Sequence, residues 1–266
     1  DDFIESEWWA LKTIWDKGLL YKGFKIVPYC PRCGTPLSSH EVAQGYKDVK
    51  ERSAIVRFKV KGEDAYFLAW TTTPWTLPSN IALCVNPEED YAKVKCADGY
   101  TYYMACALLD TILGKFAEED KPAYEVLETY KGKDLEYKEY EPLYQCAYDC
   151  AAKQKKKAFF VTCDDYVTLT DGTGVVHIAP AYGEDDNRVC RENGIGFVNP
   201  VGLDGCYTTG PWKGTLVTDP NLEIEIIKWL KENDKLFKKI KITHDYPHCW
   251  RCHSPLICYP KPAWYI

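Results

Sequence analysis

The stretch CPRCGTPL, residues Cys30–Leu37, is repeated near the other end of the chain as CWRCHSPL, residues Cys249–Leu256. Five of the eight positions are identical, and the 215 residues from 34 to 248 separate the two cysteine pairs. A CxxC turn directs two thiolates at one point, and two such turns supply the four ligands of a tetrahedral zinc ion. We therefore expect both ends of the chain to meet at one structural Zn²⁺, bound by Cys30, Cys33, Cys249 and Cys252.

Two other arrangements of these cysteines are possible. Each CxxC pair would be reduced and metal-free, or each would bind its own metal with a nearby His248, His253 or Cys258. Ordinary zinc fingers close within tens of residues, so a shared site closes a much longer loop and predicts the topology of an inserted domain. A structural zinc contributes on the order of 10 kcal/mol to folding. Because it has no open coordination position, we expect it to act as a clasp and not in catalysis.

The composition is that of an ordinary globular protein: 266 residues, 46% hydrophobic and 27% charged. No apolar run approaches the length of a membrane span, so we expect no membrane partner. The thirteen cysteines are an odd number in a large chain, which favours a reducing cytoplasm over a disulfide scaffold. The chain does not begin with Met and ends at KPAWYI, which favours a segment of a longer protein. The net charge of −6 argues against a general nucleic-acid binder, although two lysine strips are present: Lys153, Lys155, Lys156 and Lys157, and Lys235, Lys238, Lys239 and Lys241.

Hydrophobic spacing predicts several helices. The first runs from Asp2 to Lys17 and ends at Gly18, and a shorter one covers residues 105–113. Another begins near Glu184 and ends before Gly194. A further helix follows Asp219, with Pro220 at its first position, and we expect one face to carry Ile224, Ile227 and Leu230.

Between residues 49 and 179 the chain is mostly short β-type segments: AIVRFKV, AYFLAW, YAKVKC, FFVTC, YVTLT and GVVHIA. The dipeptide Asp171-Gly172 predicts a hairpin that joins the last two. This pattern lacks the regular strand–helix alternation of a doubly wound sheet. It predicts an α+β fold with a compact, barrel-like β core and peripheral helices. We expect three parts: 1–45 with a leading helix, strand and first knuckle; 46–240 as the main domain; and 241–266 with the second knuckle and a last strand.

Two further stretches carry candidate chemistry. AWTTTPWTLPSN, residues 69–80, places Thr71, Thr72, Thr73 and Thr76 among two tryptophans, where Pro74 and Pro78 interrupt regular structure. DGTGVVHIAPAYGEDD, residues 171–186, brings His177 from a strand and three acids to a helix N-terminus. Acids there commonly cap free N–H groups, and a lone histidine on a strand is usually a core residue. Capping alone does not explain a histidine and three acids converging through one short turn.

Together these stretches resemble the editing domain inserted in isoleucyl-tRNA synthetases. The resemblance covers nearly the whole chain, including WDKGLLYKGFKIVPYCPRCGTPLSSHEVAQGYKDV and YPHCWRCHSPL. The related valyl and leucyl enzymes carry Thr-Thr-Arg-Pro followed by an acid, whereas Thr73-Pro74-Trp75 fits the isoleucyl type. Motifs similar to HIGH or KMSKS are absent, so we expect neither ATP-dependent activation nor charging of tRNA by these residues.

The resemblance implies hydrolysis of the aminoacyl ester of valyl-tRNA(Ile), and of valyl-adenylate as a second substrate. It implies that Asp186 binds the substrate ammonium and that His177 excludes isoleucine. A competing role for His177 as a general base stays open. The implied catalytic residues are Asp186, His177, Thr72 and Thr73, and the implied substrate-binding residues are Thr71, Trp75, Thr76, Asn80, Gly172, Thr173 and Gly174.

The implied partners are the 3′ aminoacyl end of tRNA(Ile) and the rest of a synthetase chain, in a monomer that needs no cofactor for hydrolysis. Two other functions compete with this one. The chain would be a tRNA-docking module with a non-catalytic pocket, or a free-standing trans-editing deacylase. Intact Asp186 and His177 argue against the first, and the clasp between the two ends of the chain argues against the second.

Overall fold

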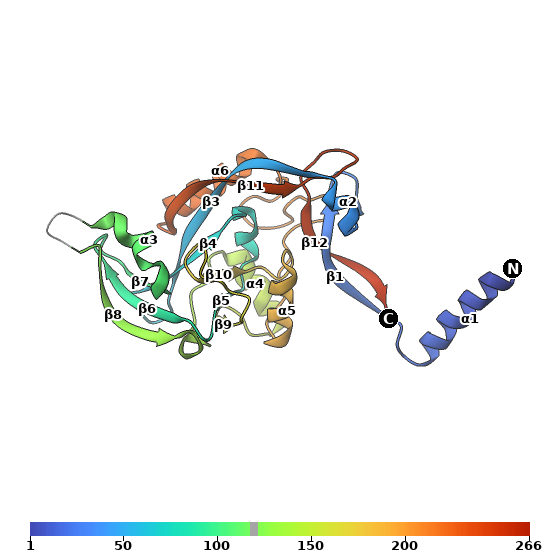
Figure 1. Ribbon diagram of the computed structural model, residues 1–266, viewed down its shortest axis with the longest axis horizontal. Helices are drawn as coiled ribbons and strands as arrows, with labels where there is room; N and C mark the ends of the chain where they lie inside the picture. Colours follow the sequence, from blue (N-terminus) through green and yellow to red (C-terminus); the bar gives the residue numbers. More distant parts are fainter. Residues whose placement is uncertain (118–121) are drawn as a thin grey trace.

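Two long antiparallel strands run side by side along the molecule (Figure 1). The computed structural model describes residues 1–117 and 122–266. Strand β3 (Tyr46–Lys59) pairs with β11 (Leu236–Pro247) from Tyr46↔Pro247 to Val56↔Leu236. One end of this pair leads into the two cysteine knuckles, and the other end enters the main sheet. The pairing therefore explains how residues more than 200 positions apart come to lie side by side.

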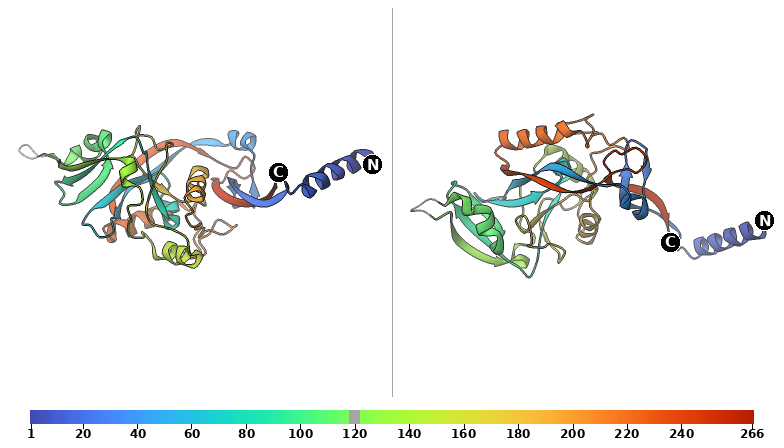
Figure 2. Two further views of the ribbon diagram at one scale, coloured as in Figure 1. Left: turned by 90° about the horizontal axis from the view of Figure 1, so that it is seen from below. Right: turned by 45° about the horizontal axis from the view of Figure 1, so that its top comes forward.

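The main sheet has nine strands and is curled, as Figure 2 shows. β11 pairs with β3, and β3 pairs with β4, which belongs to the path β8-β6-β7-β4-β10-β5-β9. Pairing is mixed, because β10 runs parallel to β4 and antiparallel to β5. The predicted α+β class with a barrel-like core is confirmed. The bounds of the remaining strands are β4 Tyr66–Thr71, β5 Ala82–Val85, β6 Asp90–Cys96, β7 Thr101–Ala105, β8 Tyr124–Lys131, β9 Val161–Cys163 and β10 Val175–Ile178.

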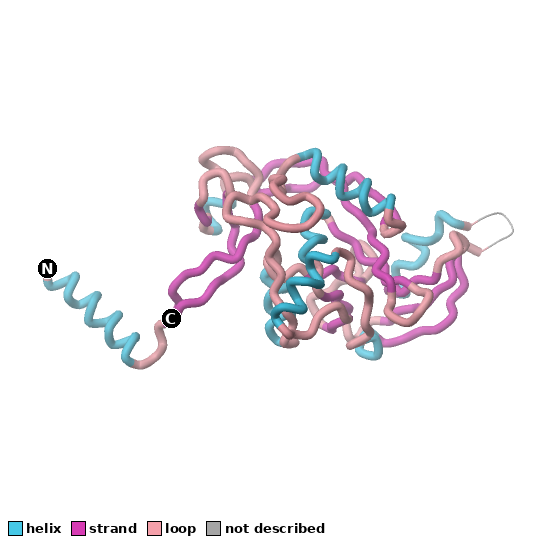
Figure 3. Tube along the Cα trace, turned by 180° about the vertical axis from the view of Figure 1, so that it is seen from behind, coloured by secondary structure: helices cyan, strands magenta, loops and turns pink. Residues whose placement is uncertain are grey.

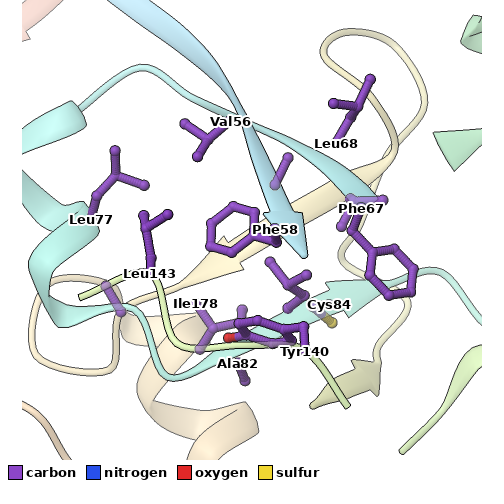
Figure 4. Packing of buried hydrophobic residues seen from close by; sticks show 14 of the residues in the cluster. Val56, Phe58, Phe67, Leu68, Leu77, Ala82, Cys84, Tyr140, Leu143 and Ile178 are labelled. Carbon is purple, nitrogen blue, oxygen red and sulfur yellow. The ribbon is translucent and has the colours of Figure 1, made fainter. Parts of the chain in front are cut away.

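The core packs against the strands of this sheet, as Figure 4 shows from close by. Phe58 of β3, Phe67 and Leu68 of β4, and Ile178 of β10 are at most 1% exposed. Tyr140, from an irregular segment, packs edge-on against Phe58 with 5.5 Å between ring centroids. The strands that carry the site are thus anchored from behind by tightly packed side chains.

A second, three-stranded sheet connects the two ends of the chain. β1 (Tyr21–Cys30) pairs antiparallel with β12 (Ile257–Tyr265) and with the short β2 (Thr35–Pro36). Helix α2 (Ser39–Ala43) follows, and a capping box between Ser38 and Glu41 caps its N-terminus. Helix α1 (Asp2–Asp16) projects away from the body and has no buried residue, as Figure 3 shows from behind. Its predicted end at Gly18 is confirmed by a left-handed φ of 69°.

The remaining helices lie around the main sheet. Both predicted later helices are confirmed, as α5 (Glu184–Glu192) and α6 (Pro220–Glu232), and Pro220 is the first residue of α6. The predicted apolar face of α6 is partly wrong, because Ile224 is 48% exposed while Leu222 and Ile226 are buried. No helix in the described ranges is both long and apolar enough to cross a membrane. The bounds are α3 Leu109–Leu113, α4 Gln145–Gln154, α5 Glu184–Glu192 and α6 Pro220–Glu232, with 3₁₀ turns η1 Pro74–Ser79, η2 Cys106–Leu108, η3 Gly114–Phe116 and η4 Gly132–Leu135.

The predicted hairpin at Asp171-Gly172 is wrong. Residues 166–170 contain no strand: Tyr166 lies in a turn, and Leu169 and Thr170 lie in a bend. The reason is that both edges of β10 are already occupied, one by β4 and the other by β5. The alternating β-branched pattern of YVTLT was a local signal that the tertiary pairing overrides.

Candidate functional site

A hollow of about 310 Å³ opens where the ends of β4 and β10 lie beside each other. We call it the threonine hollow. Thr76 and His177, from the two sequence motifs, are 101 residues apart in the chain and meet in it. The structure therefore brings the two motifs to one place. The lining side chains are Trp70, Thr71, Thr72, Thr73, Thr76, Val176, His177, Ala179, Tyr182 and Asp186.

The threonine loop turns sharply at the end of β4. Pro74 cannot donate a ladder hydrogen bond, and it begins the 3₁₀ turn η1. The Thr71 hydroxyl accepts the N–H of Thr73 at 3.1 Å, and the Thr76 hydroxyl donates to the Thr73 carbonyl at 2.9 Å. In the part of the chain that the structure describes, the hydroxyls of Thr72 and Thr73 make no hydrogen bond. Two threonines thus brace the loop, and two remain available to a ligand.

His177 is held on both ring nitrogens. Its Nε2 lies 2.8 Å from the Thr76 hydroxyl, and its Nδ1 lies 3.2 Å from the side-chain nitrogen of Asn80. The ring is 7% exposed, and burial lowers the pKa of His177 to about 4. The imidazole is therefore neutral near pH 7, and neither nitrogen has a free lone pair directed at the hollow.

Asp186 occupies the third position of α5, after the N-cap residue Gly183. One carboxylate oxygen accepts the N–H of Ala179 at 2.9 Å. Burial raises the pKa of Asp186 to about 7. A Cβ placed on Gly183 would come within 2.7 Å of the Asp186 carboxylate carbon, so glycine at 183 leaves room for that side chain. Asp186 is the acid of the three that reaches the hollow, whereas Glu184 and Asp185 are exposed.

A second hollow, of about 320 Å³, adjoins the first, and we call it the glycine hollow. Trp70 and Val176 line both. Gly172 has a φ of 78°, and a Cβ there would lie 2.7 Å from the Trp70 ring, so glycine is required by conformation and by contact. Residues 172–174 lie here as backbone, since the side chain of Thr173 is 1% exposed and turns back to Val175.

Two of the candidate residues lie differently from the others. Asn80 is 1% exposed and contacts His177 from behind. Trp75 borders another hollow and packs against Tyr182, with 4.8 Å between ring centroids.

Trp70 was missed by the sequence analysis, although it immediately precedes the first threonine. Its position was the available signal, because the residue before the loop on β4 shares the sheet with β10.

The four predicted cysteines also come together. Cys30 Sγ lies 3.5 Å from Cys252 Sγ, and Cys33 Sγ lies 4.0 Å from Cys249 Sγ. Tetrahedral zinc with Zn–S bonds of about 2.3 Å places its sulfurs about 3.8 Å apart, so the donor set fits this ion. Among the described residues, the group able to hold a metal consists of these four cysteines and none of the nearby histidines.

The sequence repeat is also a structural repeat. Gly34 donates its N–H to the Cys30 carbonyl, and His253 donates to the Cys249 carbonyl, both at 2.8 Å. Both residues adopt left-handed backbone, with φ of 67° and 60°. The two knuckles are therefore copies of one turn and meet face to face, which joins the terminal regions of the chain.

Solved structures identify the fold. The editing domain of the cytosolic leucyl-tRNA synthetase of P. knowlesi matches with a TM-score of 0.52 and 13% identity, over 73% of this chain and 98% of that chain. The corresponding domain of P. falciparum matches with a TM-score of 0.54 and 12% identity, over 70% and 98%. The chain has the fold of a tRNA-synthetase editing domain.

The family follows from sequence comparison. Residues 1–266 match the family model of the class I tRNA synthetases (I, L, M and V), and the chain belongs to this family. The isoleucine–tRNA ligase of Clostridium acetobutylicum is 53% identical over all of this chain and 24% of its own length. That of Picrophilus torridus is 47% identical over all of this chain and 25% of its own length. The chain thus spans about a quarter of the curated relatives it matches, and the expected family is confirmed.

Proposed function

We propose that the chain hydrolyses the ester of valyl-tRNA(Ile), and valyl-adenylate as a second substrate, as the editing part of an isoleucine–tRNA ligase. The observation that carries the proposal is the convergence of Asp186, His177 and two available threonine hydroxyls on one hollow. This convergence supports catalysis over a tRNA-docking module with a non-catalytic pocket. The experiment that tests it is the release of valine from valyl-tRNA(Ile) by this chain.

Asp186 would bind the α-ammonium of the substrate. An ionised carboxylate is a natural charge-assisted acceptor for such a group. Oδ2 of Asp186 accepts the N–H of Ala179, and Oδ1 is the oxygen that would accept from the ammonium. The terminal adenosine of the tRNA would lie in the glycine hollow, across Trp70. The shared Trp70 wall places the two hollows next to each other, as a substrate with an amino acid joined to a nucleoside requires.

The threonine hollow would select by size. Isoleucine exceeds valine by one methylene, worth only about 1–3 kcal/mol in a hydrophobic pocket, a limit for which isoleucyl-tRNA synthetase is itself the standard example. A second site that excludes the larger side chain multiplies the selectivity of the first. His177 suits the role of a wall, because its ring is fixed by Thr76 and Asn80 and both nitrogens are engaged.

The reaction itself is the hydrolysis of an ester. Water attacks the ester carbonyl carbon, the bond to the ribose oxygen breaks, and the ribose oxygen takes the proton, which yields valine and tRNA. Thr72 and Thr73 would hold the water and the carbonyl oxygen through their hydroxyls. A fixed donor at the developing oxyanion is commonly worth several kcal/mol.

The four-cysteine cluster would hold a structural zinc ion, through Cys30, Cys33, Cys249 and Cys252. When bound, the ion supplies a cross-link between the two terminal segments and no open coordination position. The partners proposed for the chain are the 3′ end of tRNA(Ile) and the rest of a synthetase.

Replacing His177 with alanine is expected to create a new activity. The wall is shortened, so hydrolysis of isoleucyl-tRNA(Ile) should rise at least tenfold, while valyl-tRNA(Ile) is still hydrolysed. Deacylation rates on both esters measure this. If His177 were a general base, valyl hydrolysis would be lost and nothing gained. His244→Ala is the matched control, because His244 bonds Glu51 on the long strand pair and lies outside both hollows.

A further inference from the structure

A continuous chain of hydrogen bonds leads from the wall of the threonine hollow into the core. The Tyr140 hydroxyl donates to the side-chain oxygen of Asn80 at 2.7 Å. The Asn80 nitrogen lies 3.0 Å from the Ala82 carbonyl and 3.2 Å from His177 Nδ1. His177 Nε2 then reaches Thr76 at 2.8 Å. The side chains that form this hydrogen-bond series are each at most 7% exposed. Water therefore does not compete for these hydrogen bonds.

Only one assignment of donors satisfies every bond. The Ala82 carbonyl is an acceptor, so the Asn80 atom facing it is the NH₂ group and not the oxygen. The second hydrogen of that NH₂ group then points to His177 Nδ1, which must accept. His177 consequently carries its proton on Nε2 and donates it to the Thr76 hydroxyl. The Thr76 hydroxyl in turn donates to the Thr73 carbonyl at 2.9 Å, so the order of donors ends in the threonine loop.

Tyr140 is placed rigidly at the start of this chain. Its ring is 2% exposed and lies within the packed core that Figure 4 shows with Phe58 and Ala82. Edge-to-face contacts with Phe58 and Phe159 hold it, with ring centroids 5.5 and 6.1 Å apart. Its backbone N–H donates to the Phe159 carbonyl at 2.9 Å. Because Tyr140 cannot turn away, its hydroxyl fixes the Asn80 amide in one orientation.

We propose that Tyr140 is a specificity-determining positioning residue, which acts through Asn80 to hold His177 in the Nε2–H tautomer and in one ring orientation at the wall of the threonine hollow. This inference rests on the function proposed above. It also assigns Asn80 to the support of the wall instead of to substrate contact. A wall that excludes a side chain larger by one methylene must not be displaced by the width of a methylene group. A buried network in which every polar group is hydrogen-bonded provides such rigidity. Tyr140 lies outside both motifs and touches neither hollow.

The test is Tyr140→Phe, which keeps the ring and its packing but leaves the Asn80 oxygen without its donor. The ¹⁵N chemical shifts of the His177 ring distinguish the two tautomers. We expect a single Nε2–H form in the parent chain and a mixture in the variant. Deacylation of isoleucyl-tRNA(Ile) relative to valyl-tRNA(Ile) should rise about tenfold in the variant. A merely structural role would lower stability and move neither readout.

Tyr103→Phe is the matched control. Tyr103 is 1% exposed, and its hydroxyl donates to Glu63 at 2.9 Å, away from both hollows. It should lose stability with the tautomer and the selectivity unchanged. An Nδ1–H tautomer in the parent chain overturns the proposal, even where Tyr140→Phe does not fold. So does a folded Tyr140→Phe with the parent's shifts and selectivity. Failure of the parent chain to hydrolyse valyl-tRNA(Ile) overturns the proposed function instead, and the ¹⁵N shifts still decide the order of hydrogen bonds.

Discussion

Asp186→Asn is expected to lower deacylation of valyl-tRNA(Ile) at least a hundredfold and to stabilise the folded chain at about pH 8. Activity falls because the ammonium loses its charged acceptor. Stability rises because burial holds the pKa of Asp186 at about 7, against an ordinary value of 3.8. A raised carboxyl pKa means that the fold favours the protonated form, so stability is lost as pH rises from about 4 through about 7. Asparagine keeps the acceptor for Ala179 without the charge.

Asp185→Asn provides the control for this prediction. Asp185 is exposed and its ion pair with Arg188 spans 3.4 Å, so the substitution should change both activity and stability little.

The free-enzyme kcat/KM of the parent chain should fall as pH drops below about 7, as Asp186 takes up its proton. Rates and thermal unfolding at several pH values measure this. Full valyl deacylation by Asp186→Asn would rule out the ammonium role.

Removal of zinc is expected to unfold the clasp and spare the main core. A structural zinc is worth on the order of 10 kcal/mol, and the clasp has its own small cluster of buried residues, which includes Leu37, Val42 and Leu256. Chelation or Cys249→Ser should therefore expose the amides of Gly34 and His253 to hydrogen exchange. The amides of β4, β5 and β10 should stay protected, because they belong to the large core.

Metal content distinguishes the possible arrangements of the cysteines. We expect one zinc per chain, lost in Cys249→Ser and retained in Cys258→Ser, because Cys258 lies on β12 outside the four-cysteine cluster. Two zinc ions per chain would instead support separate sites with nearby histidines. A chain that binds no zinc would contradict the clasp.

The sequence predicted the parts of the fold that local chemistry or an internal repeat specifies. The two CxxC turns indicated that the terminal regions meet, and the structure joins them through the β3–β11 pair. Proline and an N-terminal acid were sufficient to place α6 and α5. The strand expected over residues 166–170 is wrong, because sheet edges are a tertiary property that no local pattern records.

The site shows the same division. His177, Asp186 and the threonines stand in two motifs, and their convergence followed from the resemblance. Trp70 lies within the first motif, but the pattern AYFLAW predicts it only as a strand residue. Tyr140 carried no signal, since it is one of 20 tyrosines and acts through a contact 60 residues away in sequence. Residues that support a site from the core are set by packing, which sequence spacing does not report.

The most direct measurement of the central claim is the deacylation rate of valyl-tRNA(Ile) and isoleucyl-tRNA(Ile) by this chain, under identical conditions. A site that admits valine and excludes isoleucine should hydrolyse the valyl ester at least about a hundredfold faster. A parallel reaction without protein gives the background of spontaneous hydrolysis. Equal rates on the two esters, or no rate above that background on either, would contradict the account.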